Sequence, residues 1–147
     1  VMELAAEMHK KKLEFSDKAR KEMQIFGGAV ENILNRSVQA FLENDKNLAM
    51  TVEPLAEVID QLNKDVKKRH VKRLRKGKCT IELGLLLSDI ATNYERVSDH
   101  CSNLAVYMIQ SEDSNFEAHE YMNHLKSDTK RNFDFMLEAY KNQYMLP

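Results

Sequence analysis

The sequence predicts an all-α domain, built as an antiparallel bundle of three or four long helices. The 147 residues include only four glycines and two prolines, which leaves little room for the turns of a β-sandwich. Apolar residues recur at steps of three, four and seven over long stretches, as they do along one face of a helix. Short polar segments separate these stretches, and short connections are typical of antiparallel neighbours.

The first helical stretch covers residues 2–43. Gly27–Gly28 interrupts its pattern and indicates a kink, a joint between two helices, or close helix packing. Asn44–Asp45 is a turn and N-cap signal. A second helix extends to about Arg75, and because Pro54 is awkward inside a helix, it either kinks there or properly begins near Thr51.

The glycine and cations of residues 76–78 end the second helix, and Thr80 caps a third one that runs to about Gln110. A polar loop covers residues 111–114. Ser114 then opens a capping box and a fourth helix through about residue 142. We therefore interpret residues 1–147 as a single domain, with a core repeat at about 20–110 and an additional C-terminal helix at about 114–142.

Composition narrows the functional classes. Lys and Arg total 22 against 23 Asp and Glu, so no overall charge bias favours a nucleic acid or another polyanion. No apolar run approaches the 18 to 20 or so residues that span a bilayer, and no signal peptide is readable. Cys79 and Cys101 are expected to be reduced thiols of a cytoplasmic protein, although one bridge is conceivable. Because the chain opens with Val1, we interpret it as a soluble fragment of something longer.

The most informative stretch is residues 94–103, late in the third helix. Glu95 and Asp99 stand four residues apart, so on a helix their carboxylates lie one turn above the other and repel unless a cation lies between them. Asn103 follows one turn further as a neutral oxygen donor. This set could ligate a hard cation or iron through oxygen. Alternatively, Glu95, Arg96 and Asp99 form a surface ion-pair network of little energetic weight.

A second acidic group lies on the second helix. Glu53, Glu57 and Asp60 follow at steps of four and three, so they could face Glu95 and Asp99 across the bundle or across a subunit interface. They could equally be ordinary polar helix surface.

Catalytic motifs are poorly supported. The Glu-x-x-His step of di-iron bundles is absent from the sequence, as are phosphate loops, paired-cysteine motifs and Ser-His-Asp arrangements. Glu120 and His124 stand four residues apart beside His119, but an exposed histidine on a helix is usually solvated. The alternatives that stay open are a metal-dependent helical-bundle enzyme and a metal-free helical adaptor.

The segment Lys64–Lys78 is strongly basic, with nine lysines and arginines and Asp65 as its only acid. It could contact anionic lipid headgroups or a phosphate-bearing ligand. It could also be a solvated helix end that complements the helix dipole. No aromatic residues interleave with these cations, so nucleic acid is not an expected partner.

These residues carry a family resemblance. The order Glu95-Arg96, Asp99-His100 and Asn103 resembles the ExxxD motif of the PhoU family, helical domains tied to bacterial phosphate uptake, and the stretch from Glu57 to Leu62 is similar to that family's second helix. More narrowly, residues 70–105 resemble the C-terminal cytoplasmic PhoU-like domain of bacterial sodium/phosphate cotransporters. The resemblance covers roughly residues 20–110, whereas the first and last helices match only in character.

The resemblance implies a regulatory domain, not an enzyme, with a PhoU-like (spectrin-repeat-like) bundle of long helices. It implies a divalent or ferric ion at Glu95 and Asp99, with Glu53, Glu57, Asp60 and Asn103 as weaker candidates. PhoU proteins proper carry two repeats, and this chain has one full motif, so a cluster would need the second acidic group or a second subunit. The expected partners are the membrane-embedded transporter portion of the same protein and further copies of the chain. The expected location is the cytoplasmic face of the membrane.

Overall fold

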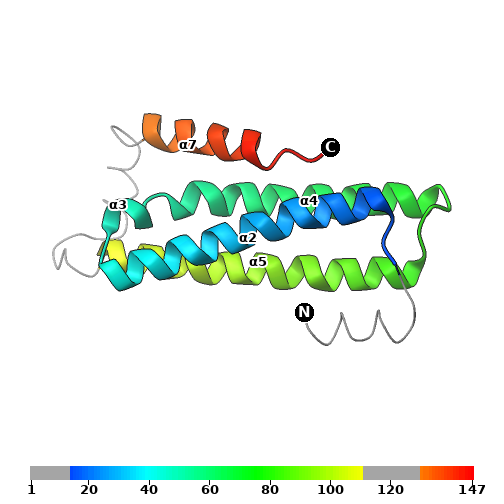
Figure 1. The fold of residues 1–147 in the computed structure, drawn as a ribbon, viewed down its shortest axis with the longest axis horizontal. Helices are drawn as coiled ribbons and strands as arrows, with labels where there is room; N and C mark the ends of the chain where they lie inside the picture. Colours follow the sequence, from blue (N-terminus) through cyan, green and yellow to red (C-terminus); the bar gives the residue numbers. More distant parts are fainter. Residues whose placement is uncertain (1–13, 111–129) are drawn as a thin grey trace.

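The fold is a bundle of helices, seen in a computed structural model that describes residues 14–110 and 130–147. The elements in order are α2 (Asp17–Glu43), α3 (Lys46–Ala49), α4 (Val52–Arg75), α5 (Ile81–Gln110) and α7 (Lys130–Gln143). The long helices α2, α4 and α5 run antiparallel to their chain neighbours, and α7 packs along α4 (Figure 1). The predicted all-α bundle is therefore confirmed. None of the helices in the described part is long and apolar enough to cross a lipid bilayer.

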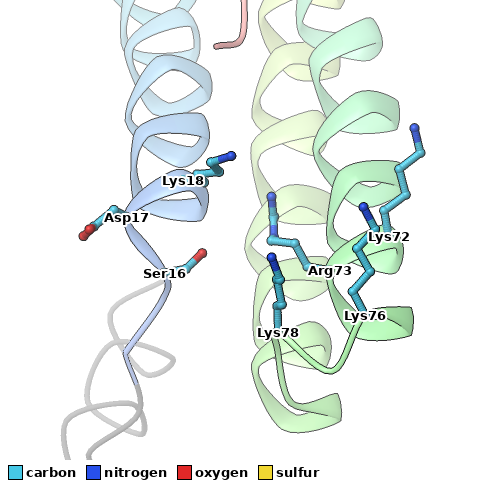
Figure 2. A pocket seen from close by; sticks show the side chains of 7 residues that line it. All are labelled: Ser16, Asp17, Lys18, Lys72, Arg73, Lys76 and Lys78. Atoms are coloured by element: carbon cyan, nitrogen blue, oxygen red, sulfur yellow. The ribbon is translucent and has the colours of Figure 1, made fainter.

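The first long helix begins later than the sequence pattern predicted. Residues 14–16 are not helical, and α2 begins at Asp17 because the Ser16 hydroxyl accepts a hydrogen bond from the Ala19 amide at 3.3 Å. The continuous helix predicted over residues 2–43 is thus wrong at this point, and its residues 2–13 lie outside the described part. Figure 2 shows this end of the bundle. Gly27 lies within one unbroken helix, where a methyl group would come within 3.3 Å of the Tyr94 hydroxyl, so it permits close packing.

The connection between α2 and α4 follows the predicted turn. Asn44 adopts the left-handed conformation that ends α2, and the Asp45 carboxylate accepts a hydrogen bond from the Leu48 amide at 3.0 Å, which starts the short α3. Helix α4 begins after Thr51, the second of the two expected outcomes. Pro54 lies in the first turn, where a missing amide hydrogen costs no hydrogen bond within the helix.

The turn between α4 and α5 contains Gly77, whose φ of 63° favours glycine. Thr80 caps α5 as predicted, with its hydroxyl accepting a hydrogen bond from the Leu83 amide at 3.2 Å. The predicted loop at 111–114 and the Ser114 capping box lie outside the described residues. Of the predicted helix at 114–142, the described part contains α7.

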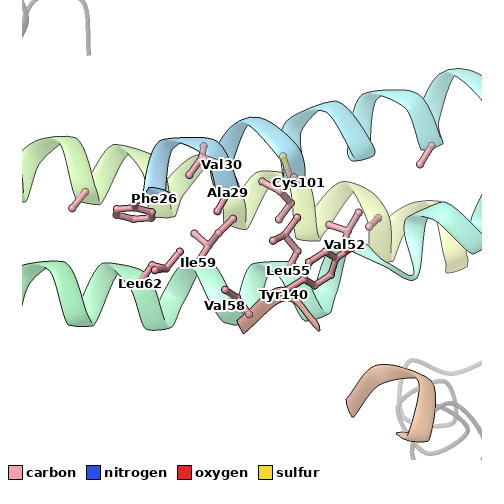
Figure 3. Packing of buried hydrophobic residues seen from close by; sticks show 14 of the residues in the cluster. Phe26, Ala29, Val30, Val52, Leu55, Val58, Ile59, Leu62, Cys101 and Tyr140 are labelled. Atoms are coloured by element: carbon pink, nitrogen blue, oxygen red, sulfur yellow. The ribbon is translucent and has the colours of Figure 1, made fainter. Parts of the chain in front are cut away.

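The core runs along the axis between α2, α4 and α5 (Figure 3). On α4, Val52, Leu55, Ile59, Leu62 and Val66 are buried, whereas Leu74 near the end of the helix is only partly buried. On α2, Leu34, Val38 and Phe41 are about half exposed or more, because they lie to one side of the buried stripe formed by Phe26, Ala29, Ile33 and Ala40.

Helix α7 joins the bundle through aromatic side chains. Tyr140 is buried against the core, and the Arg36 guanidinium lies 5.6 Å from the centre of its ring. The Asn32 side-chain amide donates a hydrogen bond to the Tyr144 hydroxyl at 2.7 Å. These contacts tie α7 to α2 as well as to α4.

Candidate functional site

An acidic hollow of about 270 Å³ opens between α4 and α5. Helix α4 contributes Glu53, Glu57 and Asp60 to its lining, and α5 contributes Asp99, Ser102 and Asn103. Steps of four and three residues on each helix place these groups on the sides that face each other. Of the two interpretations of the second acidic group, the structure therefore favours the one in which it faces the ExxxD motif.

The carboxylates of this hollow are close enough to influence one another. Burial raises the pKa of Asp60 above its ordinary value, and the charges of Asp99, Glu95 and Glu53 raise it further, while Lys64 partly opposes them. Glu53 is held in place, since its carboxylate accepts a hydrogen bond from the Ser102 hydroxyl at 2.5 Å. The carboxylates around the hollow therefore repel one another, and a bound cation would reduce this repulsion.

Glu95 lies beside this hollow and does not line it. Its carboxylate accepts a hydrogen bond at 2.5 Å from the side-chain amide of Asn63, which is buried on α4. Two buried oxygens, Asn63 Oδ1 and Ser98 Oγ, have no hydrogen-bond partner within residues 14–110 and 130–147. Over the same residues no ion pair joins Arg96 to Glu95 or Asp99, so the predicted alternative of a surface ion-pair network is not what forms.

The chemistry of the donors fits a hard cation, because carboxylate and amide oxygens are the ligands such ions prefer. The geometry as placed is not a closed site: across the described residues, no three His, Cys, Asp or Glu side chains converge closely enough to hold an ion. Ligation would need rotation of exposed side chains such as Glu57 and Asp99. Glu120, His119 and His124 lie outside the described part of the chain.

Two arginines of the basic segment Lys64–Lys78 contact a buried carboxylate. Arg73 Nη1 donates to both carboxylate oxygens of Glu22, at 2.9 and 2.7 Å, and Arg69 Nη1 reaches the same carboxylate at 3.4 Å. The Glu22 side chain is only 4% exposed, so these arginines neutralise a buried charge. Sequence reasoning missed Glu22, although a carboxylate standing between Ala19 and Phe26 on the apolar face was a readable signal.

A further polar group lies where α4 meets the start of α5. His70 is buried, and its Nδ1 lies 3.6 Å from the Cys79 sulfur. Burial lowers the pKa of His70, and the Arg73 charge lowers it further against the opposing effect of Glu22. A methyl group on Gly84 would come within 2.4 Å of His70 Nε2, so the imidazole occupies the space that this glycine leaves.

The two cysteines are free thiols, as expected from the sequence. Cys101 is buried in the core, and burial raises the pKa of its thiol although a hydrogen bond with Ser37 opposes the shift. A buried thiol with a raised pKa is a poor nucleophile.

Comparison with known proteins agrees with this architecture. Residues 23–108 match the family model described as the PhoU domain. The chain is 34% identical over 92 residues to the phosphate-specific transport system accessory protein PhoU homolog 1 of Thermotoga maritima. That alignment covers 63% of this chain and 40% of the relative, so the chain spans less than half of that protein's length. No solved structure matches the chain at a significant level. Since the family model spans more than half of the chain, including both sides of the acidic hollow, the chain belongs to the PhoU domain family.

Proposed function

We propose that this domain regulates phosphate transport and catalyses no reaction itself. The observation that carries the proposal is the match of residues 23–108 to the PhoU domain, together with similarity to an accessory protein of a phosphate-specific transport system. The described residues support a binding role better than a catalytic one. Their acidic hollow gathers carboxylates from two helices, which suits the binding of a cation.

Phosphate uptake tests this role directly. Uptake is measured over a range of external phosphate concentrations, in cells that carry the full gene and in cells that lack only the segment encoding this domain. We expect the dependence of uptake on external phosphate to change. Superimposable uptake curves would overturn the regulatory proposal.

We further propose that the regulated protein is a sodium/phosphate cotransporter whose membrane-embedded portion belongs to the same chain. The support is the sequence block at residues 70–105, which resembles the cytoplasmic domain of such transporters. This proposal places the domain at the cytoplasmic face of the membrane. Replacing sodium with potassium in the uptake assay should abolish the domain-dependent part of uptake, and uptake indifferent to sodium would refute the assignment.

For the acidic hollow we propose a divalent or ferric cation held by Asp60 and Asp99, with Glu57 and Asn103 as additional oxygen donors. The cation would supply the positive charge that offsets their mutual repulsion. It would also link α4 to α5, because the donors come from both helices. Stiffening the pair in this way is a route by which the domain could change its contact with the transporter or with a second copy.

The cation proposal is tested by loading the chain with Mg²⁺, Ca²⁺, Mn²⁺ or Fe³⁺ and measuring bound metal, melting temperature and sedimentation. A cation at one hundred times its dissociation constant stabilises the folded state by about 2.7 kcal/mol. The variant Asp60→Asn/Asp99→Asn should lose this effect. The matched control Asp65→Asn/Asp89→Asn changes one acid on each of the same helices outside the hollow and should keep it. Equal metal content in all three proteins would refute cation binding in the hollow, and absence of bound metal from all three would leave the metal-free adaptor as the correct interpretation.

A further inference from the structure

A second hollow, of about 480 Å³, lies at the end of the bundle where α2 begins and α4 ends. We call it the basal hollow. Lys18 comes from α2, Lys72, Arg73 and Lys76 come from α4, and Lys78 comes from the turn before α5 (Figure 2). Among the residues that the structure describes, Asp17 is the single carboxylate in the lining, so five cations stand against one anion.

The helix dipole explains only part of this cluster. Cations in the last turn of α4 complement the negative end of that helix, which would account for Lys72 and Arg73. Lys18, however, lies in the first turn of α2, where the dipole favours acids and disfavours a cation. Its presence opposite the α4 lysines is therefore not a capping effect.

Neither do ion pairs within the fold explain the cluster. Asp17 is taken by Arg20, whose Nη2 lies 2.5 Å from its carboxylate, and Figure 2 shows Asp17 directed away from the α4 lysines. Of the five cations, Arg73 is paired with Glu22. In the described part of the chain, the four lysines have no carboxylate partner. Like charges gathered around one concavity repel each other, and an anion from solution would remove that repulsion.

Three other cations of the basic segment interact with groups outside the basal hollow. Lys67 donates a hydrogen bond to the Thr92 hydroxyl at 3.2 Å, and Arg69 contacts Glu22. Lys64 acts on Asp60, at the acidic hollow. The cations of Lys64–Lys78 that line the basal hollow lie between residues 72 and 78, and Lys18, which is distant in the sequence, joins them there.

We propose that the basal hollow binds an anion that carries two or more charges on phosphate oxygens. Each lysine ammonium offers three donors as a compact charge, which suits a phosphate group approached from several sides. The described residues of the lining include no aromatic side chain on which a base could stack, so a nucleic acid is disfavoured. A soluble phosphate compound and an anionic lipid headgroup present the same chemistry. This inference does not depend on the cation proposed between α4 and α5.

Calorimetric titration of the full chain with pyrophosphate, at low and at physiological salt, tests the proposal. A parallel arm uses co-sedimentation with vesicles of phosphatidylcholine, with and without phosphatidic acid. The variant Lys72→Gln/Lys76→Gln removes two exposed charges from the hollow. The matched control Lys64→Gln/Lys67→Gln removes two charges from the same helix outside it. Circular dichroism confirms that both variants fold.

We expect the hollow variant to weaken binding by about tenfold or more, and the control to weaken it by less than about threefold. Binding of pyrophosphate that depends on Lys72 and Lys76 identifies a soluble ligand. Binding only to vesicles with phosphatidic acid, with the same dependence, identifies a lipid headgroup. Equal weakening by both variants would mean that overall charge attracts the anion, and this result would overturn the proposal. Absence of binding in both arms would overturn it as well.

Discussion

The buried ion pair between Glu22 and Arg73 makes the sharpest stability prediction. Their side chains are 4% and 14% exposed, and the two nitrogen–oxygen distances are 2.7 and 2.9 Å. Removing one partner of a fully buried pair costs about 3–5 kcal/mol, because the other charge is left buried without compensation. Glu22→Gln keeps one oxygen acceptor, and Arg73 is partly exposed where it lines the basal hollow. We therefore expect a loss of about 2–3 kcal/mol in the free energy of unfolding.

Urea unfolding followed by circular dichroism at neutral pH measures this loss, which corresponds to a fall of about 5–10 °C in melting temperature for a chain of this length. Glu138→Gln is the control, since the Glu138–Lys141 pair is exposed and its removal should leave the urea midpoint unchanged. The double variant Glu22→Gln/Arg73→Met should recover part of the loss. A change below about 1 kcal/mol for Glu22→Gln would refute the reasoning, because the pair would then behave as a surface contact.

Three further predictions concern the packing around α5 and α7. Gly84→Ala should destabilise the domain by about 1–3 kcal/mol in urea unfolding, because the new methyl group forces the His70 ring out of place; Gly28→Ala meets no atom within 4 Å and should be neutral or stabilising. The folded state lowers the pKa of His70 below 6.5, so the unfolded chain binds its proton first as pH falls. Stability should therefore drop from pH 6.5 downward, and His70→Gln should remove that part of the pH dependence; an unchanged slope would contradict it. Tyr140→Ala should lower the free energy of unfolding by about 3–5 kcal/mol and make α7 more accessible to proteolysis, because this buried side chain packs α7 against the core. Unchanged stability and unchanged proteolysis would contradict this role of α7.

Local sequence signals determined the helices well wherever capping chemistry was visible. Asp45 and Thr80 begin helices as expected, and Pro54 could be placed because a proline is tolerated in a first turn. The missed cap at Ser16 has a physical reason: the apolar periodicity continues through it, so the pattern alone predicts an unbroken helix.

Only the tertiary structure shows which helix faces pack against each other. Steps of three and four residues establish that Glu53, Glu57 and Asp60 share one side of a helix, yet they cannot say what that side faces. The hollow exists because α4 and α5 pack with those sides together, which is what raises the pKa of Asp60. The same packing directs Glu95 to Asn63 and leaves Asp99 at the hollow.

The sequence by itself determined the fold class, most helix boundaries and the family, because these depend on local periodicity, capping and the order of residues 94–103. Tertiary structure alone decided how the charges are distributed. Lys18 joins the lysines at the end of α4, and Glu22 neutralises Arg73, across 54 and 51 positions of sequence respectively. No local pattern encodes such pairs, since they form only when the antiparallel packing of α2 against α4 brings the two helix ends together.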